Sequence, residues 1–209
     1  MDEKLVRDLV EDLKLRAERS KLPVPVGVSN RHVHFTKEDF KAVFGADAEA
    51  CLLKDIKQPG QFACKERVTI EGPKGSIANV RMIGPYRPYT QVEISLGDAR
   101  ALGLEPPIRD SGKLDNSPGI KITGPKGSIQ LKRGVILSKR HIHFSLKEAE
   151  AYRIKDGMEV RVRCGAGDRT TVYEHVLCRA SDKYALEFHL DMEEANAAGL
   201  KNGDPAYIV

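Results

Sequence analysis

The chain has 209 residues, 41% of them hydrophobic, with a formal net charge of +4 and six histidines. Acidic and basic side chains are interspersed and no aromatic residues alternate with basic clusters, which argues against nucleic-acid binding and favours a small anionic partner. The four cysteines lack C-x-x-C spacing, which argues against a disulfide framework, and no signal peptide or apolar membrane span is present, so we expect a cytosolic protein.

Residues 2–20 predict an amphipathic helix. Leu5, Leu9 and Leu13 recur every four positions and form an apolar stripe, while charged side chains occupy the other faces. Pro23 and Pro25 mark the end of the helix. Two interpretations remain open at this point: the stripe packs on its own domain, or the helix is a detachable peptide that docks on a partner.

The next stretch is the most informative, because its R-H-x-H-F motif occurs twice. We interpret Pro25–Phe35 as a strand that carries the first copy, and the second copy follows a similar β-branched run. Alternate residues share one face of a strand, so the two histidines of each copy lie side by side as a pair of metal ligands. One pair alone would indicate surface histidines, but two pairs in the same context predict metal binding. The pairs are His32 with His34 and His141 with His143.

A third ligand for each pair follows from the internal repeat. Val92–Leu104 aligns with Phe188–Leu200 through a shared A-x-A-x-G-L ending, which places Glu93 opposite His189. We therefore predict two sites with three protein ligands each, a number that leaves a coordination position open, as in catalytic centres. The predicted sets are His32, His34 and Glu93, and His141, His143 and His189. His175 has no counterpart in the other half and is left outside both sets.

Short helices are predicted after each histidine pair, with Thr36 as the N-cap of the first. Val68–Glu71 and Ile77–Ile83 predict strands joined by a G-P-K-G-S string, which recurs from Gly124 onward. We interpret both strings as turns, and the alternative for Lys74 is a lysine that faces phosphate. A P-loop is excluded because the glycine spacing is too short.

An arginine and a serine near the Glu93 strand are candidates for anion binding. Arg87 lies between two ring-stiffened positions six residues before Glu93, where its guanidinium could hold an oxyanion through two hydrogen bonds. Ser111, in a polar loop near the middle of the chain, could donate to the same anion. The alternative for Arg87 is a solvated surface side chain.

The remaining segments, among them Glu159–Arg163 and Thr171–Cys178, predict further short strands, and Met192–Ala198 predicts a short helix. Many short strands with glycine- and proline-containing turns indicate β-barrels or a β-sandwich. The duplication predicts two similar halves that pack together.

Six motifs, spread over roughly residues 22–208, resemble the PduL family of phosphate acyltransferases. They are Val26–His34, Gln58–Gln61, Thr90–Ser95, Arg109–Gly112, Arg140–His143 and Asp191–Ala198. The resemblance implies a mainly β fold of two similar closed β-barrels capped by short helices, with a dimetal site between them. It implies that the first strand crosses over to complete the second barrel, which gives domains of residues 31–139 and of 21–30 plus 140–209. Residues 1–20 would be the amphipathic helix, which in members of bacterial microcompartments is an encapsulation peptide.

The resemblance also implies an activity and a set of site residues. The reaction is the transfer of a short acyl group, propanoyl or acetyl, between coenzyme A and phosphate, with two Zn²⁺ or other divalent ions held by the six ligands named above. Arg87 and Ser111 would bind phosphate. The residues implied to lie along coenzyme A are Val28, Ser29, Asn30, Lys74, Arg81 and Asn196. Expected partners are acyl-CoA, phosphate, further copies of the chain as a homodimer or larger homo-oligomer, and microcompartment shell proteins, with no nucleic acid and no membrane.

Two other functions fit the same residues. A dinuclear zinc metallohydrolase would place water where the acyltransferase binds phosphate. A non-catalytic microcompartment module would use its metals only for structure, but such sites have four protein ligands, whereas three are predicted here.

Overall fold

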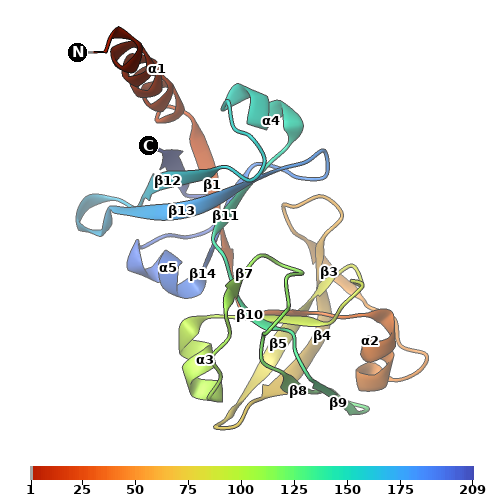
Figure 1. Cartoon of the computed structure of the whole chain (residues 1–209). Coiled ribbons are helices and arrows are strands. Elements are labelled where there is room, and N and C mark those ends of the chain that lie inside the picture. Colours follow the sequence, from red (N-terminus) through yellow and green to blue (C-terminus); the bar gives the residue numbers. More distant parts are fainter. Residues whose placement is uncertain (1) are drawn as a thin grey trace. The chain divides into compact units, whose positions relative to one another are not determined.

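The computed structural model describes residues 2–209, which form two compact units (Figure 1). The first unit contains the chain up to Ser29 together with Arg140–Val209, and the second is Asn30–Lys139. Strands make up most of the regular structure, in agreement with the mainly β prediction. Within residues 2–209, no helix combines the length and apolar character that spanning a membrane requires.

The first unit is a closed barrel of six strands in the order β1-β14-β11-β13-β12-β15. Its strands are β1 Pro23–Ser29, β11 His141–Phe144, β12 Glu159–Cys164, β13 Thr171–Ala180, β14 Glu187–Asp191 and β15 Pro205–Ile208, and its helices are α1 Glu3–Arg19, α4 Leu146–Ala151 and α5 Met192–Ala197, with a 3₁₀ turn at Gly167–Arg169. The N-terminal strand β1 closes the barrel, because it runs parallel to β14 and antiparallel to β15. The crossover implied by the resemblance is therefore present, and the red β1 lies among blue strands in Figure 1.

The second unit is a nine-stranded sheet whose main path is β7-β10-β6-β2-β5-β4-β8-β9, with β3 paired to β4. Its elements are β2 His32–His34, α2 Lys37–Phe44, β3 Leu52–Asp55, β4 Phe62–Glu71, β5 Ser76–Gly84, β6 Gln91–Ile94, α3 Leu96–Leu102, β7 Ile108–Arg109, β8 Ile120–Thr123, β9 Ser128–Leu131 and β10 Val135–Ser138. Each unit has a hydrophobic core of its own, which contains Phe144 and Phe188 in the first and Phe35 and Phe40 in the second.

The prediction of two closed barrels is correct for the first unit only. In the second, β9 returns along β8 as a hairpin and takes the edge that a closing strand would need. The strand that corresponds to β1 is β10, which pairs with β6 as β1 pairs with β14. One backbone bond, from Val135 N–H to the Pro118 carbonyl at 3.1 Å, joins the start of β10 to the chain before β8. Within the described residues, the strands of the second unit therefore do not pair into a closed barrel.

The prediction of one strand over Pro25–Phe35 is also wrong, because this run forms two strands that belong to different units. β1 ends at Ser29 and β2 begins at His32. β1 forms its ladders with β14 and β15, whereas β2 forms its ladders with β5 and β6. The side chain of Asn30 accepts a 2.8 Å hydrogen bond from the Arg31 backbone and stabilises the break between them. The second copy of the motif divides in the same way, into β10 and β11.

The repeated G-P-K-G-S strings are turns, as predicted, and both pack on the end of a helix. The Gly72 N–H bonds to the Gly75 carbonyl at 2.9 Å in the first turn. Lys74 then donates its backbone N–H to Leu102 O at the end of α3, and Lys126 donates to Val43 O at the end of α2. A Cβ at Gly72 would lie 2.4 Å from Leu102 O, so this close approach requires glycine. The strings thus satisfy carbonyls that helices leave unpaired.

Helix α1 is joined to the first unit through its last turn. Arg19, its one buried residue, donates from Nε to the Tyr152 carbonyl at 2.8 Å and from Nη2 to the Arg153 carbonyl at 2.6 Å, just beyond α4. The predicted apolar stripe is exposed, with Leu5 at 63% and Leu9 and Leu13 at 56%. The interpretation that this apolar stripe packs on its own domain is therefore wrong within residues 2–209.

Candidate metal centres

The first predicted ligand set comes together on one face of two antiparallel strands. β2 and β6 pair in a register that places His32 opposite Glu93 and His34 opposite Gln91. One potential ligand atom from each of His32, His34 and Glu93 lies within 4.8 Å of the others. The Glu93 carboxylate is 3.7 Å from His32 Nε2 and 3.9 Å from His34 Nε2. The pleat of both strands therefore directs all three side chains to one point.

Backbone carbonyls fix the orientation of both imidazoles in this cluster. His32 Nδ1 lies 2.8 Å from Asn30 O, and His34 Nδ1 lies 2.9 Å from Ile83 O. A carbonyl can only accept, so Nδ1 carries a proton in both rings and Nε2 faces Glu93. Burial, with a contribution from the neighbouring His32, lowers the pKa of His34 to about 3. The ring is therefore neutral, which is the form that binds metal.

Gln91 links this cluster to the loop that contains Ser111. Its Nε2 donates to Glu93 Oε1 at 2.6 Å and to Ser111 Oγ at 2.9 Å, and its Oε1 accepts from the Gly112 backbone at 2.7 Å. Gln91 is fully buried. Ser111 is therefore held next to the predicted ligands although it is 18 residues beyond Glu93 in the chain.

Arg87 lies beside the same cluster. Its backbone N–H bonds to the Phe35 carbonyl at 2.8 Å, directly after the β2 histidines, and its Nη2 donates to Gln61 Oε1 at 3.3 Å. Its buried Nε has no hydrogen-bond partner. The positive charge of Arg87 is one of the causes that lower the pKa of His34. The guanidinium thus presents a donor that is not used within the described chain, next to three potential ligands.

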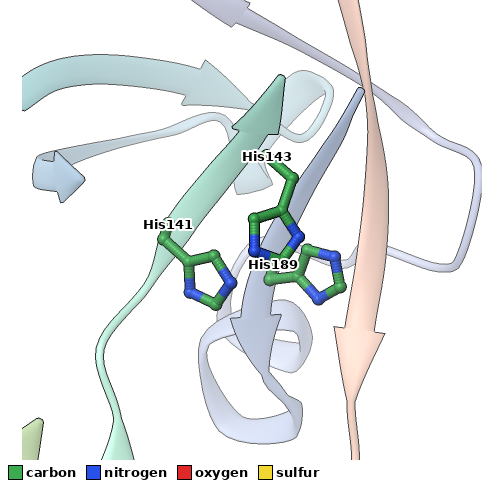
Figure 2. Close-up of side chains that lie close together, drawn as sticks. All are labelled: His141, His143 and His189. Atoms are coloured by element: carbon green, nitrogen blue, oxygen red, sulfur yellow. The ribbon is translucent and has the colours of Figure 1, made fainter. Parts of the chain in front are cut away.

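The second predicted ligand set gathers in the same manner in the first unit, as Figure 2 shows. β11 and β14 are antiparallel, with His141 opposite His189 and His143 opposite Glu187. The three histidines offer ligand atoms within 4.8 Å of one another, and the His141 and His189 rings stack at 5.0 Å between centroids. Burial, together with His141 and His189, keeps the pKa of His143 far below its usual range.

Both clusters fit a divalent metal ion. Among the described residues, the two nitrogens of His143 and Nε2 of His189 are buried polar atoms without a hydrogen-bond partner, a costly arrangement unless a ligand engages them. Neutral imidazoles and one carboxylate are donors that suit zinc and related ions. His175, left outside both sets, is exposed and lies 3.1 Å from Glu159.

In each unit an arginine joins the strand of the histidine pair to a helix. Arg31, directly before His32, pairs with Asp98 at 2.7 Å, and Arg140, directly before His141, pairs with Glu194 at 2.6 Å. Asp98 and Glu194 are the acidic residues of the capping boxes that begin α3 and α5, the helices that follow the third predicted ligands. These pairs hold the strand of each histidine pair to the helix after the third ligand.

Sequence reasoning did not identify four polar residues that border the clusters. They are Gln91, Arg179, Tyr184 and Glu187. Arg179 lies opposite His143 in the pairing of β11 with β13 and donates to the Tyr184 hydroxyl at 3.0 Å, and the Tyr184 ring stacks on His143 at 4.1 Å. The internal alignment places Gln91 opposite Glu187, a position that could have been recognised as part of each site.

The residues implied to contact coenzyme A are distributed over both units. Val28 and Ser29 are in β1 and Asn196 is exposed on α5, all in the first unit, and Asn30 is the first residue of the second. In the second unit Arg81 lies opposite His32 in β5, whereas Lys74 is exposed in the turn before that strand. Within the second unit, therefore, Arg81 borders a ligand cluster and Lys74 lies at the other end of β5.

The fold and the two clusters define a mainly β protein with candidate metal centres and an adjacent arginine suited to an anion. The family model for phosphate propanoyltransferase matches residues 25–201, and the chain belongs to this family of acyltransferases. The chain is similar to the phosphate propanoyltransferases of Thermotoga maritima, 54% identical with 88% of each chain covered, and of Alkaliphilus metalliredigens, 46% identical over the full length of both. That of Clostridioides difficile is 43% identical over 99% of this chain and 98% of its own.

Proposed function

We propose that this chain is a phosphotransacylase that interconverts propanoyl-CoA or acetyl-CoA plus phosphate with the acyl phosphate plus coenzyme A. The observation that carries the proposal is the position of Arg87, whose buried Nε has no partner, beside the His32, His34 and Glu93 cluster in a chain of the phosphate propanoyltransferase family. In this reaction a phosphate oxygen forms a bond to the acyl carbon while the bond between that carbon and sulfur breaks, and the sulfur leaves as a thiolate.

The role of Arg87 is to hold phosphate in a position to attack the thioester. Its planar guanidinium suits two oxygens of the anion, and Ser111, held by Gln91, adds a hydroxyl donor. Fixing both reactants turns an encounter in solution into an attack within one complex. Val28, Ser29, Asn30, Lys74, Arg81 and Asn196 are proposed to contact coenzyme A.

The six predicted ligands are proposed to hold two divalent ions, Zn²⁺ in the first instance, one at each cluster. A metal there would supply Lewis acidity towards the thioester carbonyl and a favourable charge for the leaving thiolate. No cysteine acyl carrier is required. Burial raises the pKa of the Cys64 and Cys164 thiols to about 11 and that of Cys178 to about 12, so these three remain protonated and poorly nucleophilic.

The reaction is tested by measuring coenzyme A release from acetyl-, propanoyl-, butanoyl- and hexanoyl-CoA with and without phosphate, on samples whose metal content is known. We expect release that requires phosphate, saturates with it and is fastest for the two shorter thioesters. Equal release without phosphate would identify a hydrolase instead. No release from metal-loaded protein would favour the non-catalytic module.

We also propose that α1 directs the enzyme to a partner, such as a microcompartment shell protein. Support comes from the exposure of Leu5, Leu9 and Leu13, since an apolar stripe on a helix gains stability only when something covers it. The Arg19 contacts fix only the end of the helix, so the stripe is available for docking while the barrel remains intact.

Two truncations separate the docking segment from the residue that anchors it. Removal of residues 2–15 keeps Arg19 and should leave metal content and activity unchanged, with the free energy of unfolding within about 0.5 kcal/mol of wild type. Removal of residues 2–20 also eliminates the Arg19 hydrogen bonds and should destabilise the protein by about 1–3 kcal/mol. Denaturant titration with both variants measures the difference.

The docking itself is tested with residues 1–20 fused to a fluorescent reporter. The fusion should form puncta in cells that make microcompartment shells and stay diffuse in cells that lack them. Diffuse fluorescence in both would contradict the localisation, and loss of fold on removing residues 2–15 would show that the whole helix is structural.

A further inference from the structure

One buried side chain of the second unit, that of Gln91, contacts both a predicted metal ligand and the loop of Ser111. Gln91 is the first residue of β6, two positions before Glu93, so both side chains point to the same face of the strand. It is fully buried. An amide that is removed from water needs partners for its two N–H hydrogens and for its oxygen, and all three have a partner here.

The backbone of Gly112 determines which way this amide lies. A backbone N–H can only donate, and the nitrogen of Gly112 is 2.7 Å from Oε1 of Gln91, so the amide oxygen faces the loop. The NH₂ group is then left for the other two partners, Glu93 Oε1 at 2.6 Å and Ser111 Oγ at 2.9 Å. A reversed amide would place two oxygens against each other at the Glu93 contact, which is repulsive.

This orientation fixes the direction of the Ser111 hydroxyl. Each hydrogen of the NH₂ group is used by one acceptor, so Ser111 Oγ accepts from Gln91 and does not donate to it. The hydrogen of the hydroxyl is therefore directed to an acceptor other than the amide. A hydroxyl that already accepts a hydrogen bond is also a better donor, because hydrogen bonds in a chain polarise one another. Gln91 thus gives Ser111 the polarity that binding of an anion requires.

The same amide restricts the Glu93 carboxylate. A bond of 2.6 Å from an N–H to a carboxylate oxygen is short, and it opposes rotation of the carboxylate about its last torsion. The other oxygen of Glu93, Oε2, lies 3.7 Å from His32 Nε2. Hydrogen-bonding partners of this kind orient metal ligands and raise the affinity of a site. One side chain therefore acts on a predicted metal ligand and on a predicted phosphate donor.

We propose that Gln91 is a positioning residue that directs the Ser111 hydroxyl to phosphate and fixes the Glu93 carboxylate for metal binding, so that both sites depend on one amide. The inference rests on the proposed phosphotransacylase function and deepens it. It predicts two separate defects when the amide is removed, one in metal affinity and one in phosphate affinity, and the second of these acts through Ser111.

Gln91→Met removes the amide at nearly constant side-chain volume. In competition with a chromogenic chelator, we expect one metal equivalent to bind about 10–100-fold more weakly while the other is unchanged. In protein loaded with both equivalents, the KM for phosphate should rise about 10–100-fold, the effect of losing a hydrogen bond to a charged group. Ser111→Ala should raise this KM to a similar extent but leave both metal affinities at their wild-type values.

The double variant Gln91→Met/Ser111→Ala tests whether the two residues act as a unit. If Gln91 affects phosphate only by directing the hydroxyl, the double variant should have the same KM for phosphate as Ser111→Ala alone. Two independent contributions would multiply instead.

A measurement on the unchanged protein does not depend on how well a Gln91 variant folds. The two NH₂ hydrogens of Gln91 give distinct NMR signals in ¹⁵N-labelled protein. Addition of Zn²⁺ should shift the signal of the hydrogen on Glu93, and addition of inorganic phosphate to the zinc-loaded protein should shift that of the hydrogen on Ser111. Signals that respond to neither addition would contradict the proposal.

Thr90→Val is the matched control. Thr90 is buried directly before Gln91, and its hydroxyl also makes two hydrogen bonds, from the Thr36 backbone N–H at 3.0 Å and to the Asp39 carboxylate. Both partners belong to the start of α2, and valine keeps the shape of threonine without its hydroxyl. The variant should unfold at a lower temperature but keep the wild-type metal affinities and KM for phosphate.

Three further results would overturn the assignment. They are wild-type metal affinities in Gln91→Met, effects on the KM for phosphate that multiply in the double variant, and equal losses in Thr90→Val. Wild-type protein that releases coenzyme A without any dependence on phosphate would instead refute the proposed function, so the two failures are distinguishable. Thermal unfolding of the metal-free variants verifies that each one folds.

Discussion

Replacing His141 by alanine is expected to remove one of two bound metal equivalents and to lower turnover by more than about 100-fold, since losing partners of the ligands alone costs roughly 10–100-fold. His141 lies opposite His189 and its ring stacks on that imidazole at 5.0 Å. Without it, the cluster loses one of three predicted histidine ligands. Elemental analysis and the phosphate-dependent release of coenzyme A measure the two effects on one sample.

His175→Ala is the control for this substitution. His175 belongs to the same unit, is exposed and contacts Glu159, so its removal should change neither metal content nor activity. Unchanged turnover in His141→Ala would contradict the assignment of this cluster to catalysis. Retention of two equivalents would contradict its assignment to metal binding.

Arg87→Ala is expected to raise the KM for phosphate or to lower kcat while the metal content stays constant. A buried charge-assisted contact is worth about 2–4 kcal/mol, which corresponds to a loss of tens- to several-hundred-fold in kcat/KM for phosphate. Arg87→Lys should recover only part of this loss, because an ammonium cannot reproduce the two parallel hydrogen bonds of the guanidinium.

Arg133→Ala provides the comparison, since Arg133 is an exposed arginine of the same unit that pairs with Asp115 at 2.7 Å. Its removal lowers the net charge equally and should leave the phosphate dependence unchanged. A phosphate dependence in Arg87→Ala that matches wild type would exclude the proposed role. A loss shared by both variants would indicate general electrostatic attraction instead.

The gathering of the candidate ligands into two clusters could be predicted from the sequence because a strand makes their geometry local. In an H-x-H pair the two side chains share a face wherever the strand is placed, and the duplication supplied the third ligand by alignment. Glu93 and His189 lie opposite His32 and His141, at the positions that the alignment of the two halves predicted. Thr36 as an N-cap follows from equally local chemistry, and its hydroxyl accepts from Asp39 N–H at 3.0 Å.

What the sequence did not reveal depends on which strands pair. The division of Pro25–Phe35 into two strands reflects a change of partners, from β14 and β15 to β5 and β6. The polar residues at the break, among them Asn30, do not by themselves reveal this change. The open second sheet likewise results from β9, which competes for the edge of β8. Helix α3 was not predicted as a helix, although the Ser95 and Asp98 capping box is visible in the sequence.

The polar neighbours of the ligands were missed for a different reason. Gln91 and Glu187 occupy the same place in the two units but differ in residue type, so an alignment that seeks identity passes over them. Their importance becomes visible only through contacts, with Glu93 in one unit and His189 in the other. A search for complementary pairs, such as an amide beside a carboxylate and a carboxylate beside an imidazole, would have found both.

The use of β1 to close the first barrel has a consequence for synthesis of the chain on the ribosome. β1 is made about 160 residues before its partners β14 and β15, a delay of ~10–30 s at usual elongation rates. During that interval the second unit, whose residues are continuous in the chain, has everything it needs to fold. During this time β1 has no partner strand, and its backbone could pair with another nascent chain. Pro23 and Pro25 lack N–H donors and therefore limit such pairing.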